Sequence, residues 1–212
     1  MLELFLMAFV TFFVIIDPPG IAPVFAGVTE GGSKPWRRTM ALKASGIASL
    51  VLVGFAFGGA WLLGAMGVSL AAFRVAGGVL LFLIAVDMLF EKRTERREAR
   101  TDEVISHMDE KHMEREDISV FPLAIPLISG PGAIAAIMLY MAEHDAWAAK
   151  GMVLAAAGVN ILMCLVMMLS IDLMMKIMGK TVAAMITRIF GVILSALAAQ
   201  MVVDGLKVLF LA

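Results

Sequence analysis

The residues best suited to chemistry are Asp17-Pro18-Pro19-Gly20, which place a carboxylate beside a helix break inside an apolar run, 4–28. Each proline removes a helical N–H and clashes with the carbonyl one turn earlier, and Gly20 allows dihedrals that other residues avoid. Broken backbone at membrane depth is tolerated only where protein or a water-filled cavity satisfies the freed polar groups. The motif therefore predicts a discontinuous helix beside a polar site. Asp17 would cap the second half-helix, bind a coupling cation or carry a proton.

A second copy of the break, Ser129-Gly130-Pro131-Gly132, lies inside another apolar run, 118–142. Aligning Pro19-Gly20 with Pro131-Gly132 places the two breaks at corresponding positions in the two halves of the chain. Paired hydrophobic segments interrupted by Gly and Pro are the best sequence indication of a transporter's binding site. A single break would be equally well explained by a proline kink packed against neighbouring helices.

The ends of the half-helices supply the predicted binding chemistry. Unpaired N–H groups at 20–22 and 132–134 suit a substrate carboxylate, and carbonyls near Ile16 and Ile128 suit a cation or an ammonium group. A small zwitterion would satisfy both kinds of end, and the small residues around the breaks favour a small neutral solute. The residues predicted to bind substrate are Asp17, Pro19, Gly20, Ile21, Ser129, Gly130, Gly132, Ala133 and the mid-span Asn160.

Four further charged residues lie near the ends of apolar runs and are candidates for coupling or gating together with Asp17. We expect Arg74 to pair with Asp204 on one side of the membrane and Arg188 to pair with Asp87 on the other. Such pairs would be gates that break alternately or structural staples. The staple interpretation is slightly favoured, because breaking a buried ion pair is strongly destabilising.

Composition indicates a polytopic membrane protein. The chain has 212 residues, of which 61% are hydrophobic, and a formal net charge of -1, which argues against a nucleic-acid partner. Cys164 lies in an apolar run, and the histidines fall outside the expected spans in no metal-ligand spacing (His107, His112 and His144). An intramembrane enzyme would need a nucleophile–base pair or a metal cluster. We therefore expect no enzyme, no metal and no cofactor.

The uncharged runs predict an all-α fold with six transmembrane helices. Their expected ranges are near 4–28, 40–63, 70–90, 119–141, 151–171 and 182–203. One membrane domain would then comprise a first three-helix repeat (1–90), a charged cytoplasmic loop (91–117) and a second three-helix repeat (118–212).

The repeat extends beyond the breaks, because 73–80 (FRVAGGVL) resembles 187–194 (TRIFGVIL). Three crossings reverse the side on which the chain emerges, so the two units would have inverted topology, with the first and fourth helices discontinuous. Basic residues concentrate in the loops after the first, third and fifth spans. The positive-inside rule then places those loops in the cytoplasm and both termini in the periplasm of a bacterial inner membrane.

The whole chain resembles the MarC family of integral membrane proteins. The motifs that carry the resemblance are 12–20 (FFVIIDPPG), 125–134 (IPLISGPGAI), 73–78 (FRVAGG) and 187–191 (TRIFG). The resemblance implies a six-span inner-membrane protein grouped with transporters of small neutral amino acids, with glycine and alanine as associated substrates. Where the family usually has Asn after the first break, this chain has Ile21, which removes a polar side chain from the expected site.

The functional hypothesis is a secondary transporter of a small neutral solute in the lipid bilayer, driven by a H⁺ or Na⁺ gradient, and able to form a homo-oligomer. The alternatives are an exporter or permeation pathway for another small solute or drug, and a membrane protein that serves as a partner without transporting anything.

Overall fold

The computed structural model describes residues 1–90, 117–177 and 179–211, and these ranges contain helices and short connections without strands. The charged segment that was expected to form a cytoplasmic loop, with His107 and His112, lies almost wholly outside the described residues. The elements are α1 (Leu2–Ile16), α2 (Pro18–Val28), α3 (Lys34–Ala65), α4 (Leu70–Leu89), η2 (Ser119–Ile128), α6 (Pro131–Glu143), α7 (Trp147–Leu169), α8 (Ile171–Ile177) and α9 (Gly179–Leu211).

The described residues contain five helices that are long and apolar enough to cross a membrane, or six if a bent pair counts as one span. This confirms the expected all-helical, multi-span class. The bent pair is η2 with α6, which meet at 57° across the second predicted break. η2 is itself irregular, because Phe121 and Ile125 have extended dihedrals before Pro122 and Pro126. The first break is confined to Asp17, between α1 and α2.

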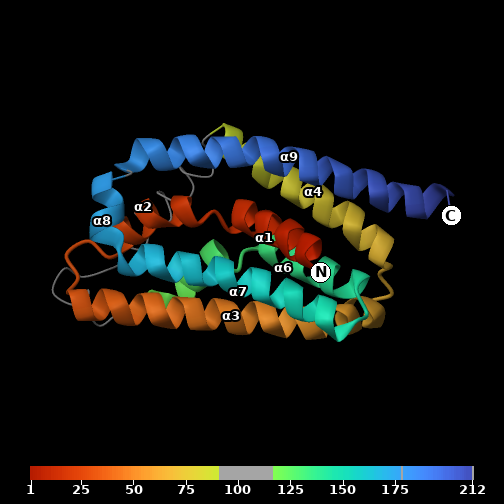
Figure 1. Ribbon diagram of the computed structural model, residues 1–212, viewed down its shortest axis with the longest axis horizontal. Coiled ribbons are helices and arrows are strands. Elements are labelled where there is room, and N and C mark those ends of the chain that lie inside the picture. Colours follow the sequence, from red (N-terminus) through yellow and green to blue (C-terminus); the bar gives the residue numbers. More distant parts are fainter. Residues whose placement is uncertain (91–116, 178, 212) are drawn as a thin grey trace.

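Helices α4 and α9 lie side by side and form one of the layers of the bundle (Figure 1). They are antiparallel and very close: a Cβ added at Gly205 would lie 3.0 Å from the Ala71 carbonyl oxygen, and one at Gly191 would lie 3.0 Å from the Ala85 carbonyl oxygen. α1 and α2 pack against α7, and α3 packs against η2 and α6. The interrupted helices therefore lie among the continuous ones.

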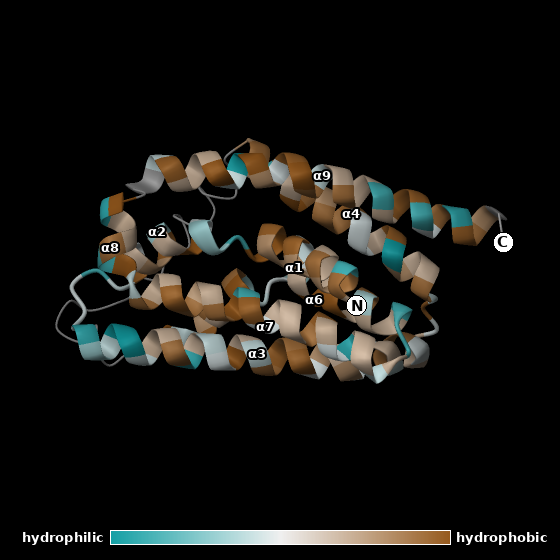
Figure 2. Cartoon of the chain, in the orientation of Figure 1, coloured by the Kyte–Doolittle hydropathy of each residue, from teal (hydrophilic) through white to brown (hydrophobic). Residues whose placement is uncertain are grey.

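The outer faces of the continuous helices are apolar, as a lipid-facing surface requires. Large exposed apolar residues occur on α3 and α9, including Leu50, Trp61 and Ile189. Figure 2 shows hydrophobic residues over most of the bundle and a hydrophilic link between α1 and α2 in its interior. The motif 54–58 (GFAFG) predicts close helix packing. That prediction is wrong, because a Cβ at Gly54 or Gly58 would meet no atom within 4 Å.

The two ends of the bundle differ in charge. At the basic end, where α2 is followed by α3, Arg37 bonds to Asp172 of α8 at 3.1 Å, and Lys43 bonds to Asp117 at 2.7 Å. The opposite end, called the cavity end, holds both termini (Figure 1). The basic end matches the side on which the sequence concentrates lysine and arginine.

Gly191→Ala should destabilise the protein by about 1–3 kcal/mol, because the added methyl group would press on backbone and Cβ atoms of α4 that cannot retreat. Gly54→Ala is the matched control: nothing lies within 4 Å of its added Cβ, and alanine favours helix over glycine. Thermal unfolding in detergent measures both. A Gly191→Ala protein as stable as Gly54→Ala would contradict the close packing of α4 on α9.

The ion pair at the basic end predicts a pH dependence. Hydrogen bonds from Lys43 and Ser119 lower the pKa of Asp117 from 3.8 to about 2. A carboxylate with a depressed folded-state pKa stabilises the protein above its unfolded pKa and loses that contribution as pH falls through the folded one. We expect a small loss of stability between about pH 4 and pH 2, because Asp117 is half-exposed and its pair is screened. Asp117→Asn should flatten that part of the unfolding profile, and an unchanged slope would contradict the assignment.

Candidate functional site

Asp17 joins α1 and α2 and lies wholly inside the bundle. Its backbone is in the left-handed region (φ 58°, ψ 64°), and its N–H donates to the Phe13 carbonyl to close α1. Its side chain is fully buried and caps α2, with the Gly20 N–H donating to Oδ1 at 3.2 Å. Pro18 and Pro19 have no N–H, so the cap satisfies the first donor that α2 presents. The capping role predicted for Asp17 is therefore present in the structure.

The second carboxylate oxygen of Asp17 accepts a hydrogen bond from α9. Thr187 donates its hydroxyl to Oδ2 at 2.9 Å, and Thr187 is itself buried. The side chains of Phe13 and Phe190 meet edge-on, with ring centroids 5.1 Å apart, between the same two helices. One carboxylate thus holds together the end of α1, the start of α2 and the first third of α9.

The second break has a different geometry and no capping side chain. Gly130 precedes α6 in an extended conformation, and no side chain bonds to the first turn of α6. Ser129 is buried, but its hydroxyl donates back to the Ala124 carbonyl at 2.8 Å. Gly132 and Ala133 begin α6 in the buried interior. Of the two breaks, the second therefore leaves a helix N-terminus without a side-chain cap. At the first break, the Gly20 N–H could bind a substrate carboxylate only if the side chain of Asp17 were displaced.

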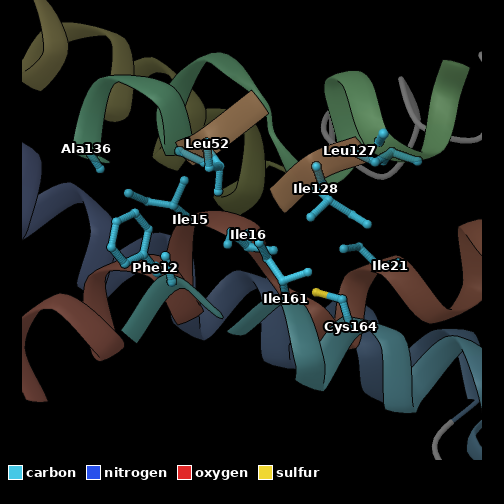
Figure 3. Packing of buried hydrophobic residues seen from close by; sticks show 14 of the residues in the cluster. Phe12, Ile15, Ile16, Ile21, Leu52, Leu127, Ile128, Ala136, Ile161 and Cys164 are labelled. Atoms are coloured by element: carbon cyan, nitrogen blue, oxygen red, sulfur yellow. The ribbon is translucent and has the colours of Figure 1, made fainter. Parts of the chain in front are cut away.

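The centre between the breaks is closed by apolar side chains. Figure 3 shows Ile16 and Ile21 of the first broken helix and Ile128 of the second gathered near Ile161 and Cys164 of α7. All of them are buried. A Cβ added at Gly132 would lie 3.0 to 3.1 Å from three aliphatic side chains, those of Leu81, Ile84 and Ile15. Pro19, Gly20 and Ala133 are also buried, whereas Gly130 is partly exposed, so most of the residues predicted to bind substrate at the two breaks are closed off from solvent.

Asn160 of α7 contacts α1 rather than either break. Its Nδ2 donates to the Phe9 carbonyl at 3.2 Å and to the Ala156 carbonyl at 2.9 Å. Its Oδ1 is buried without a hydrogen-bond partner in the structure. The bond to Phe9 joins α7 to α1, and the bond to Ala156 lies within α7, so both donors of Asn160 are used by backbone carbonyls outside the two breaks.

The expected pair of Arg74 with Asp204 is wrong. Arg74 Nη2 lies 2.5 Å from Oε1 of Glu143, at the end of α6. Asp204 instead accepts a hydrogen bond from Gln200 at 2.9 Å and lies 4.0 Å from Lys207 on its own helix. Glu143 is closer because α6 ends beside the start of α4. The pairing of Arg188 with Asp87 stays a prediction.

Arg74 and Asp204 nevertheless line one cavity of about 410 Å³ at the cavity end, between α1, α4, α6 and α9. Thr11 and Tyr140 also line it, and their hydroxyls are hydrogen-bonded across α1 and α6 at 3.0 Å. Within the described residues, no group of three or more His, Cys, Asp or Glu side chains is placed to hold a metal ion.

Sequence reasoning missed three of these residues. Thr187 was part of a repeated motif without a role of its own, and its position before Arg188 in a buried stretch was the available signal. Tyr140 is the single tyrosine of the chain, and its place in an apolar run was a signal. Glu143 gave no such signal in the sequence, because it lies at the end of an apolar run like an ordinary interfacial carboxylate.

Thr187→Val should destabilise the protein by about 1–3 kcal/mol, because it keeps the shape of the side chain and removes a donor from a buried carboxylate. Thr39→Val is the matched control: its exposed hydroxyl bonds only to the Pro35 carbonyl of its own helix. Unfolding in detergent compares the two variants. Equal stabilities would show that the bond from Thr187 to Asp17 contributes little.

Comparison with known proteins gives the chain's relatives. The model of the MarC family, described as integral membrane proteins, matches residues 2–210. A UPF0056 membrane protein of Methanocaldococcus jannaschii is 35% identical over 97% of this chain and 97% of its own length. One from Archaeoglobus fulgidus is 37% identical over 97% of this chain and 93% of its own. UPF0056 membrane protein YvbG of Bacillus subtilis is 33% identical over 95% of this chain and 93% of its own length.

No solved structure matches the chain. The match to the family model covers nearly every residue, and the relatives align over nearly their whole length. The resemblance carried by the two breaks and by the repeated arginine motif is thereby confirmed: the chain belongs to the MarC family of multi-pass integral membrane proteins.

Proposed function

We propose that the protein is a secondary transporter that moves a small neutral solute, such as glycine or alanine, by ion-coupled alternating access. The observation that carries the proposal is the buried carboxylate of Asp17 at a break in a membrane-spanning helix, bonded to both Gly20 and Thr187. An ionisable group inside a membrane is costly and is kept where it binds or moves ions. A second broken helix in the corresponding half of the chain supports the same interpretation.

Inverted repeats are part of the proposal and are supported by the packing. The first broken helix packs on α7, and the second packs on α3; likewise α2 contacts α9, and α6 contacts α4. Exchanging the two halves of the chain exchanges these contacts. Such an arrangement gives alternating access a simple form, in which one repeat rocks against the other around the central breaks.

Orientation follows from charge. The basic end holds Lys34, Arg37 and Lys43, so the positive-inside rule places it in the cytoplasm. The cavity end and both termini then face the periplasm of a bacterial inner membrane. The occluded centre and the cavity at one end fit a carrier in a state closed to the cytoplasm. The proposal makes the protein a carrier and assigns it no catalysis.

Coupling would act through the hinge at Asp17. Its charged form accepts bonds from α2 and α9 at once, and binding a proton or Na⁺ weakens at least one of them. The break could then open without leaving a bare buried charge. The tight fit around Gly132 limits the central site to small solutes.

The test is uptake of labelled glycine and alanine into proteoliposomes, with H⁺ and Na⁺ gradients imposed separately. Asp17→Asn should lose gradient-driven accumulation, while Asp172→Asn should keep it. Asparagine caps helices about as well as aspartate, so the first variant removes the charge and keeps the cap. Asp172 is an exposed carboxylate at the basic end, in a surface pair with Arg37.

Unchanged accumulation by Asp17→Asn would reject Asp17 as the coupling residue. Absence of glycine and alanine uptake under both gradients, in wild-type protein that elutes as a single species, would reject the proposed substrates. Uptake that needs no gradient and never exceeds equilibrium would favour a passive pathway over a carrier.

A further inference from the structure

We propose that the cavity at the cavity end is a binding site for a free zwitterionic amino acid with an apolar side chain. This rests on the proposed function only for its place on a transport pathway; the binding claim itself needs no transport. The cavity has a volume of about 410 Å³, within the range of about 300–1,000 Å³ that small-molecule sites occupy. It is separate from the occluded centre between the helix breaks.

The charges in the cavity favour a ligand that carries both signs. Arg74 is bonded to Glu143 at 2.5 Å, and both side chains are about a quarter exposed, at 23% and 27%. Asp204 is the second carboxylate of the lining. A ligand carboxylate would take the Arg74 guanidinium, which suits it in a planar, bidentate geometry. The ligand's ammonium group would then pair with the released Glu143 and with Asp204.

Ligands with a single charge should bind to this cavity less tightly than a zwitterion. A carboxylate alone would leave Glu143 without its cation in a half-buried cavity that also holds Asp204, and an unpaired charge there is costly. An amine alone would leave the bond from Arg74 to Glu143 in place and engage only Asp204. The zwitterion is therefore preferred because it replaces the single ion pair of Arg74 and Glu143 with two, one from Arg74 to the ligand carboxylate and one from the ligand ammonium group to Glu143 and Asp204.

The rest of the lining combines apolar side chains with two hydroxyl groups. Aliphatic and thioether side chains from α1, α6 and α9 make the apolar part: Leu4, Met7, Leu139, Leu197 and Met201. The hydrogen-bonded pair of Thr11 and Tyr140 forms the hydroxyl part. Apolar surface of this kind favours a ligand with a branched aliphatic side chain, so leucine should bind more tightly than glycine.

The difference in size between cavity and centre defines the role of the site. The cavity accepts a leucine-sized solute, whereas the surroundings of Gly132 leave no room for one extra methyl group without displacing neighbours. The cavity thus selects solutes by their zwitterionic head group, and the centre between the helix breaks selects them by size.

The experiment is calorimetric titration of the purified full-length protein in detergent, without any ion gradient. The probes are leucine, glycine, 3-methylbutylamine, which lacks the carboxylate, and 4-methylpentanoate, which lacks the ammonium group. Leucine should bind most tightly, and each single-charge analogue should bind about tenfold more weakly or worse, as the loss of a charge-assisted hydrogen bond predicts. Equal affinities of leucine and its analogues, or no binding of leucine, would overturn the proposal.

Substitutions in the lining test which residues bind the carboxylate and the ammonium group of the ligand. Arg74→Gln should weaken leucine binding about tenfold but strengthen the binding of 3-methylbutylamine, because Glu143 then loses its partner and can pair with the ammonium group, whereas Asp204→Asn should weaken both. Lys150→Gln is the control, since Lys150 lies at the same end outside the lining, over the ring of Trp147. Asp204 is 40% exposed, so its replacement leaves the fold intact even where Arg74→Gln does not. Full leucine affinity in Asp204→Asn would overturn the assignment.

A lipid head group carries charges of both signs, as an amino acid does, and a competition experiment distinguishes the two ligands. Glycerophosphoethanolamine carries an ammonium and a phosphate, and it should displace leucine only at much higher concentrations. Displacement at lower concentrations than leucine itself would overturn the assignment to a free amino acid. Leucine binding without glycine or alanine uptake would reject the proposed transport function but support the binding site. Uptake of glycine or alanine without leucine binding would reject the binding site and leave the transport function standing.

Discussion

The buried carboxylate of Asp17 is the interaction on which the interior of this protein depends. The two prolines that follow it end α1 and remove the first two amide donors of α2. The left-handed backbone at Asp17 turns the chain, and the side chain caps α2 through Gly20 while accepting the hydroxyl of Thr187. A carboxyl group in this buried position is tolerated because both of its oxygens are hydrogen-bonded, and these bonds connect three helices.

Close packing of α4 on α9 is the second interaction that shapes the bundle. Gly191 and Gly205 let the two helices approach until backbone carbonyls lie next to glycine Cα atoms. In a membrane, helices associate through such close contacts, because lipid tails are as apolar as the side chains that they replace. The closely packed pair of α4 and α9 therefore lies directly beside the interrupted helices, with α9 against α1 and α2 and α4 against α6.

Several site predictions failed where the outcome depended on distances between helices. Arg74 was expected beside Asp204, yet the end of α6 brings Glu143 closer. Gly54 and Gly58 match a packing motif and face outward from the bundle. Each failure has the same cause: a sequence pattern identifies which residues are unusual and leaves their partners undetermined.

The amino-acid sequence by itself determined the membrane class, the approximate spans, the two interrupted helices and the importance of Asp17. These follow from local rules, since apolar length specifies a span, proline breaks a helix, and a carboxylate in an apolar run needs partners. Tertiary structure alone decided which partners they are: Thr187 for Asp17, Glu143 for Arg74, and a cavity shared by four helices that are distant in sequence. Those pairings depend on how far each helix reaches and on which face it turns to its neighbour, and both are set by packing across the whole bundle.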